Sequence, residues 1–362
     1  MLAYLLLILI PVLYMFILMG LRTTYGLIEV PYKQSILKVF FFCFFLLLMF
    51  RAPTVGVDTP NYLRKLEVSP SFTWIQSVTE SDSEPGFSLL VKLISVFTQN
   101  HQIYLGVIAA IILFPIAYFY SRESVDPLFT MLIFLILPLF GMIFSGLRQS
   151  ISMALVIPAY YQIKKHHVFK FFLIISLAMT FHISAFICFL LYPVYYFKLT
   201  RKKLFFIIPL ILLTYFFRDT VFSFLLQILS YIYVDHEWEI LESGAWSMLA
   251  LFAILMVFSY VFIDEAEAEE DLLGMRNFLV LSVVIQCFAS IHALAMRMNY
   301  YFLIFLPILL PKIISKAKGK NAFACWVAEV VLCSYFMYYF LDLGLRQKSG
   351  FGIFPYAPFW QV

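Results

Sequence analysis

Long apolar segments follow one another along almost the whole 362-residue chain, separated by short polar connections. An α-helix needs about 20 consecutive apolar residues to cross the hydrocarbon core of a bilayer, and many of these segments have about that length. Charged residues make up only 13% of the sequence, whereas about 25% is usual in a soluble domain. The sequence therefore predicts an all-α polytopic membrane protein.

The apolar segments predict about twelve transmembrane helices within a single integral membrane domain, residues 1–362. The predicted spans are 2–20, 34–51, 102–120, 127–144, 146–163, 168–181, 183–199, 203–217, 246–263, 275–293, 296–315 and 321–341. The segment 85–98 is also apolar, but it is short and carries Lys92. We therefore expect it to form a re-entrant or interfacial helix.

Basic residues gather in four short loops, which the positive-inside rule places in the cytoplasm. These loops contain Arg22, Lys33 and Lys38; Lys164, Lys165 and Lys170; Lys198, Arg201, Lys202 and Lys203; and Lys312, Lys316, Lys318 and Lys320. The same topology places two long loops, 51–84 and 218–245, and the C-terminal tail, 342–362, on the outer side.

Lysine and arginine are distributed unevenly in this topology. Twelve of the fifteen lysines fall inside, whereas six arginines fall outside: Arg51, Arg64, Arg148, Arg218, Arg297 and Arg346. A guanidinium can bind phosphate or carboxylate groups in a bidentate manner, which an ammonium group cannot do. The arginines therefore suggest an anionic ligand at the outer face. The alternative is six unrelated residues at helix ends.

Arg148 stands in a polar stretch, 144–152, between two predicted spans. If this stretch begins a helix, Ser145, Arg148, Gln149 and Ser152 lie on one face. An arginine at this depth is costly unless it meets water, a partner or a ligand. It can also extend its charged end to the headgroups, so both interpretations stay open.

Further polar residues lie where other predicted spans meet the outer side. Arg297 and Tyr300 begin the span 296–315 in the same way, and His292 comes just before them. The residues that we expect to bind the ligand are Arg51, Arg148, Gln149, Arg218, His292, Arg297 and Tyr300.

Three titratable side chains are candidate catalytic acids or bases. Asp58 lies in a glycine-containing turn, where a structural cap is the alternative. Glu84 precedes a proline at a helix start, where a carboxylate often serves only the helix dipole. His182 lies between two spans, where a structural hydrogen bond is the alternative. We expect the loop 51–84 to close over Arg148 and to bring Asp58 near it, with Glu84 or His182 in the same pocket.

The sequence lacks CxxC and HExxH motifs and a phosphate-cradling glycine loop. We therefore expect no metal and no cofactor, and the sequence gives no sign of a nucleic-acid partner.

Six short motifs, in order along nearly the whole chain, resemble those of the EpsG family of bacterial exopolysaccharide membrane proteins and, more loosely, Wzy-type polymerases. The motifs are Val55-Gly56-Val57-Asp58-Thr59 with Tyr62; Glu84-Pro85-Gly86-Phe87; Phe144-Ser145-Gly146-Leu147-Arg148-Gln149-Ser150; Phe181-His182-Ile183-Ser184-Ala185; Arg297-Met298-Asn299-Tyr300-Tyr301-Phe302; and Pro355-Tyr356 with Trp360.

The resemblance implies a glycosyltransferase with a GT-C-like membrane fold in the bacterial cytoplasmic membrane. Such an enzyme polymerises oligosaccharide repeat units linked to undecaprenyl diphosphate at the outer face, for capsule, exopolysaccharide or O-antigen, without a nucleotide sugar. One lipid-linked glycan is the donor and another is the acceptor, and a chain-length regulator and a flippase are the expected protein partners. The alternatives are a flippase for lipid-linked oligosaccharide and a membrane O-acyltransferase that acts on surface glycans.

Overall fold

The computed structural model describes residues 2–25, 32–229, 245–266, 268–289, 291, 293–319, 321–346 and 350–361. Within these ranges the chain is helical, and its β-type pairing is limited to an isolated antiparallel bridge between Arg51 and Pro358. The all-α prediction is therefore confirmed for this part of the chain. The contacts divide the chain into two compact units, residues 1–186 with 323–362, and residues 187–322. Each is described by itself.

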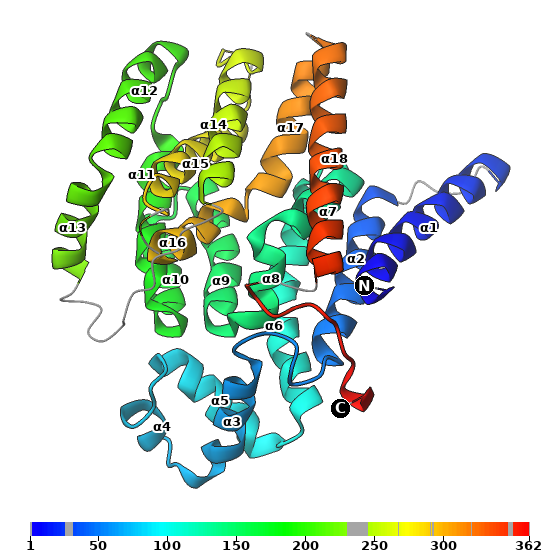
Figure 1. Cartoon of the computed structure of the whole chain (residues 1–362), viewed down its shortest axis with the longest axis vertical. Coiled ribbons are helices and arrows are strands. Elements are labelled where there is room, and N and C mark those ends of the chain that lie inside the picture. Colours follow the sequence, from blue (N-terminus) through cyan, green and yellow to red (C-terminus); the bar gives the residue numbers. More distant parts are fainter. Residues whose placement is uncertain are drawn as a thin grey trace. The chain divides into compact units, whose positions relative to one another are not determined.

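The first unit contains the helices on which the candidate site is built (Figure 1). Its helices are α1 (Leu2–Tyr25), α2 (Tyr32–Met49), α3 (Thr59–Val68), η1 (Ser69–Ser71), α4 (Gln76–Thr79), α5 (Pro85–Phe97), α6 (His101–Glu123), α7 (Pro127–Ile136), α8 (Pro138–Ser145), α9 (Leu147–Lys164), α10 (Val168–Phe181), α18 (Ala322–Arg346) and η3 (Phe359–Gln361).

The second unit begins within η2 (Ile183–Leu190). Its helices are α11 (Leu191–Tyr196), α12 (Arg201–Phe216), α13 (Arg218–Leu229), α14 (Ala245–Phe262), α15 (Glu270–Gln286), α16 (Ala293–Leu303) and α17 (Leu306–Lys318).

Several helices are apolar and long enough to cross a membrane. Among the described residues, α1, α6 and α18 meet this requirement singly. Three bent pairs, α7–α8, α12–α13 and α16–α17, meet it when each pair is taken together, which raises the number to six. Shorter apolar helices cover parts of other predicted spans, including α2, α10 and α14. The structure thus supports a membrane protein, and the total of twelve spans stays a prediction.

The predicted span 127–144 is interrupted near its middle. The helices α7 and α8 meet at an angle of 62°. Leu137, the residue between them, is extended at φ −70° and ψ 149°, and Pro138 begins α8. The ring of a proline disfavours helical backbone at the residue before it, which explains the position of the break.

In the first unit, neighbouring helices pack in the order α1, α2, α6, α9 and α10. Helix α7 packs against α2, and helix α8 packs against α9. Phenylalanine rings fill the space where these helices meet; Phe44, Phe134 and Phe140 contact one another edge-on or stacked. This aromatic core fixes the end of α8, from which the candidate site is built.

Residues 51–98 form a small helical layer at one end of this unit (Figure 1). Helix α5 packs against α3, α4 and η1, and also against α10. Lys92 of α5 is only 8% exposed, and its ammonium group donates to the carbonyl oxygens of Ser69 at 2.9 Å and Phe72 at 2.5 Å. The segment 85–98 is thus a 13-residue helix whose lysine ties this layer together.

The C-terminal tail runs beside the start of this layer. The amide of Ala52 donates to the carbonyl of Ala357 at 2.8 Å, and the amide of Gly56 donates to that of Gly352 at 2.9 Å. Two tyrosine hydroxyls extend the contact, because Tyr4 donates to Ile353 at 2.5 Å and Tyr356 donates to Leu47 at 3.0 Å.

In the second unit, α15 packs against α11, α14, α16 and α17. Its Arg276 is 1% exposed, donates to the carbonyl of Leu199 at 2.9 Å and lies over the Tyr260 ring at 3.8 Å. Asn277 donates to the carbonyls of Val194 and Phe197. These two polar side chains bind the end of α11 and the segment that follows it.

Candidate functional site

The local sequence at the start of α5 brings Glu84 close to α10. Pro85 occupies the first helical position, where its fixed φ and missing N–H suit a helix start. A Cβ on Gly86 would lie 2.8 Å from the backbone oxygen of Thr180 in α10. Glycine therefore permits the close approach of the two helices, and Glu84 reaches the end of α10 where His182 follows.

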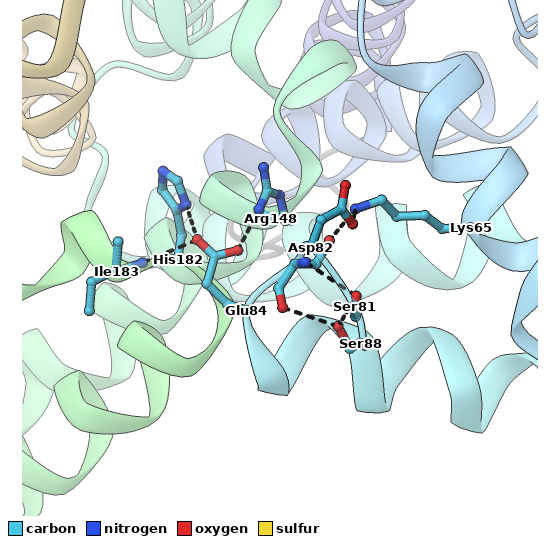
Figure 2. A network of polar contacts seen from close by, with 9 residues as sticks. Lys65, Ser81, Asp82, Glu84, Ser88, Arg148, His182 and Ile183 are labelled. Atoms are coloured by element: carbon cyan, nitrogen blue, oxygen red, sulfur yellow. Dashed lines mark hydrogen bonds and ion pairs between the residues drawn. The ribbon is translucent and has the colours of Figure 1, made fainter. Parts of the chain in front are cut away.

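Glu84 joins Arg148, at the start of α9, and His182, just after the end of α10 (Figure 2). Its Oε2 accepts a hydrogen bond from Arg148 NH1 at 2.6 Å, and its Oε1 lies 2.7 Å from Nδ1 of His182. The backbone N–H of Ile183 also points to Oε1, at 3.4 Å. Exposed side-chain fractions are 16% for Glu84, 28% for Arg148 and 12% for His182. The three groups form one partly buried network.

The contacts of Glu84 determine its charge. Burial raises the pKa of its carboxyl, but the interactions with His182, first of all its hydrogen bond, and the positive charge of Arg148 outweigh this effect. The pKa of Glu84 falls to about 2. Glu84 is therefore a carboxylate at physiological pH. Its side chain makes no cap hydrogen bond to the helix, so the simple cap that the sequence allowed is not its role here.

The loop before α3 is attached to the end of α8. Gly56 has φ +95°, a conformation that glycine adopts most readily, and a Cβ there would lie 2.5 Å from the carbonyl oxygen of Phe144. Arg51 donates to that same oxygen at 2.6 Å and is only 1% exposed. This contact holds the loop against α8, and the ligand role of Arg51 stays a prediction.

Asp58 follows directly and faces the end of α8. It stands at the N-cap position of α3, but its side chain makes no cap hydrogen bond. Ser145 Oγ donates to Asp58 Oδ2, and the Asp58 N–H points to the same Oγ, both at 3.4 Å.

Tyr62 connects Asp58 with the glutamate network. It lies one helical turn after Asp58, is 5% exposed, and is close enough to Arg148 for their charges to interact. Burial raises the pKa of the Tyr62 hydroxyl, and the negative charge of Asp58 also raises it. In the sequence, Tyr62 stands out only as part of a motif. Its spacing of four residues from Asp58 on a helix was the available signal.

A pocket of about 220 Å³ lies beside Glu84, between α3, α4 and α5. Its polar walls include Arg64, Glu80, Ser81 and Ser88. At its edge the exposed Asp82 accepts a hydrogen bond from Lys65 at 2.5 Å (Figure 2). Hydroxyl and charged side chains beside an aromatic wall suit a polar, uncharged ligand such as a sugar.

Other predicted ligand-binding residues lie elsewhere. Gln149 is 2% exposed within α9. Arg218 and Arg297 belong to the second unit; Arg218 lies over the rings of Tyr215 and Trp246, and Arg297 is exposed on α16. Tyr300 is 5% exposed. His292 lies outside the described residues.

The helices and the Glu84–Arg148–His182 network define a helical membrane protein with a charged site at the end of its first unit. The chain belongs to the EpsG family, whose model matches residues 35–357. This is a family of exopolysaccharide polymerases related to the Wzy type, so the chain has a polymerase role in polysaccharide biosynthesis. No curated protein and no solved structure matches the chain.

Proposed function

We propose that this protein is a glycosyltransferase that joins repeat units linked to undecaprenyl diphosphate at the outer face of the bacterial cytoplasmic membrane. The observation that carries the proposal is the Glu84 carboxylate held between Arg148 and His182, within the part of the chain that the family model matches. A GT-C-like fold, and a flippase and chain-length regulator as partners, belong to the same proposal.

In the reaction, an acceptor hydroxyl oxygen bonds to the anomeric carbon of the donor sugar. The bond from that carbon to the diphosphate oxygen breaks, and its electron pair stays on the diphosphate. The hydroxyl proton passes to a base. The protein therefore has to stabilise a leaving anion and accept one proton.

Arg148 is placed to meet the leaving diphosphate. Glu84 holds one part of its guanidinium, and 28% of its side chain is exposed. A guanidinium fixed in this way can direct its remaining N–H groups at phosphate oxygens. Because its partner is already in place, it needs no reorganisation when charge develops on the diphosphate.

His182 is the base in this proposal. The hydrogen bond of its Nδ1–H to Glu84 fixes the ring orientation and the tautomer, so Nε2 is the nitrogen that accepts a proton. Glu84 itself suits this role poorly, since a carboxyl with a pKa of about 2 binds a proton weakly near neutral pH. We assign Glu84 the orientation of both partners.

The pocket beside Glu84 is the proposed acceptor subsite. Ser88, one turn into α5, lines the pocket and donates a hydrogen bond to Ser81 Oγ at 2.8 Å. A sugar there would lie next to the network that activates its hydroxyl.

The test is an analysis of lipid-linked sugars in a strain that lacks this protein. We expect polymer to be absent and single repeat units to accumulate on the lipid at the outer face. Restoring the gene with His182→Ala should leave this pattern unchanged, whereas the parent should restore polymer. Units that accumulate on the cytoplasmic side instead would indicate a flippase. Normal polymer that lacks only acyl groups would indicate an acyltransferase.

A further inference from the structure

A second cavity lies in the first unit, in a groove between α2 and α6. Its volume is about 660 Å³. On α2 it is lined at positions 34, 38, 41, 42 and 45, and on α6 at 110, 113, 114, 117, 118, 121 and 122. These spacings place the lining residues of each helix on one face. None of them belongs to the site around Glu84.

The groove is polar at one end and apolar over the rest of its length. Helices α2 and α6 are adjacent in space. The polar residues lie near the start of α2 and the end of α6: Gln34, Lys38, Tyr118, Ser121 and Arg122. Phe41, Phe42, Phe45, Leu113 and Phe114 line the remainder. A ligand that matches this lining has a polar head and an apolar chain, as a membrane lipid has.

The charged residues that line the polar end are both cations. Lys38 and Arg122 are exposed, and Arg122 donates to the Tyr118 hydroxyl at 2.7 Å. The nearby Glu123 does not line the groove; its carboxylate lies 3.9 Å from Lys164. Two cations on neighbouring helices can each contact one of the two charged oxygens of a phosphodiester.

We propose that this groove binds an anionic glycerophospholipid of the bilayer. Its phosphate would lie between Lys38 and Arg122, with one acyl chain along the phenylalanines of α2 and α6. Basic pockets between transmembrane helices bind anionic headgroups in this way. The leaflet is the one at which α2 begins and α6 ends, which the predicted topology makes the cytoplasmic leaflet. The proposal does not depend on the glycosyltransferase function.

The test uses the full-length protein purified in detergent, with phosphatidylglycerol or phosphatidylcholine of the same chain length as probes. Native mass spectrometry measures the lipid retained. We expect the parent to retain phosphatidylglycerol in preference. The double variant Lys38→Gln/Arg122→Gln should bind it about 30-fold more weakly, at about 1 kcal/mol for each cation near the headgroup. A matched control, Lys165→Gln/Lys170→Gln, removes two exposed cations outside the groove and should bind like the parent.

A second variant tests the groove itself. Ala110 is exposed and lines the apolar part, so Ala110→Trp should fill the groove without disturbing the packed core. It should reduce phosphatidylglycerol retention while both cations remain. Equal retention of the two lipids by the parent would overturn the proposal, as would retention unaffected by either groove variant. Displacement of phosphatidylglycerol by an equimolar polyprenyl phosphate would assign the groove to that lipid and refute the phospholipid.

Discussion

The substitution Glu84→Gln tests the network most sharply, because it removes one charge and hardly changes side-chain size. In the parent, the pKa of Glu84 lies at about 2 instead of its ordinary 4.5. This difference corresponds to about 3 kcal/mol in favour of the ionised carboxylate. Glutamine leaves Arg148 and His182 near each other without that charge. We therefore expect Glu84→Gln to lower the free energy of unfolding by about 2–3 kcal/mol and to abolish most polymer formation.

The assay is thermal or denaturant unfolding in detergent, beside polymer formation in a complemented deletion strain. The matched control is Asp82→Asn, the same chemical change two residues away. Asp82 also accepts a hydrogen bond from a cation, Lys65, but its side chain is 83% exposed. An exposed pair contributes about 0–1 kcal/mol, so this variant should unfold nearly like the parent.

The pH dependence follows from the direction of the shift. A lowered pKa in the folded protein stabilises it fully above the unfolded value of 4.5 and no longer does so once pH has fallen to about 2. The stability difference between the parent and Glu84→Gln should be constant between about pH 6 and 8 and should shrink below about pH 4.5. If Glu84→Gln were as stable as Asp82→Asn, the ionised Glu84 carboxylate would not stabilise the fold. A stability difference that does not shrink in acid would exclude the same effect.

Three further predictions concern neighbouring groups and the topology. Arg148→Lys should reduce polymer formation at least tenfold in the complemented strain, because an ammonium cannot hold Glu84 and phosphate together in a bidentate manner; parental polymer at normal expression would exclude the diphosphate role. Asp58→Asn should reduce polymer formation only about fivefold, because the long contact with Ser145 survives and only a partly exposed charge is lost. Complete loss of polymer would make Asp58 the base. A cysteine at the exposed position 75 should react with an impermeant reagent from outside and one at 202 should not; the reverse pattern would invert the topology.

The helices could be predicted from the sequence, and their breaks only in part. Apolar runs of sufficient length identified most helices, since hydrophobic length is a local property. The bend at Leu137 had a local signal as well, the following proline, which the apolar run concealed. The layer formed by residues 51–98 depends on contacts between distant residues, such as Lys92 with the carbonyls of Ser69 and Phe72, and no local pattern specifies these.

The candidate site shows the same division. Arg148, Glu84 and His182 were all selected from sequence, because polar residues at the ends of apolar segments are costly and therefore informative. Their arrangement was not predictable, since Glu84 looked like a helix cap and instead bridges Arg148 and His182. For Arg51, the residue type and the surroundings in the fold point to different roles. Its residue type suggested a ligand, whereas its neighbours bury it against the Phe144 carbonyl.

The most direct test of the central claim is a reaction with purified components. The protein, reconstituted in liposomes, is given repeat units linked to undecaprenyl diphosphate and no nucleotide sugar. Gel analysis of the glycans and chromatography of the lipid follow the products. We expect a ladder of longer glycans, with one undecaprenyl diphosphate released for each unit joined, and no ladder from Arg148→Ala or His182→Ala. A ladder of parental intensity from both variants, or no ladder from the parent protein, would contradict the central claim.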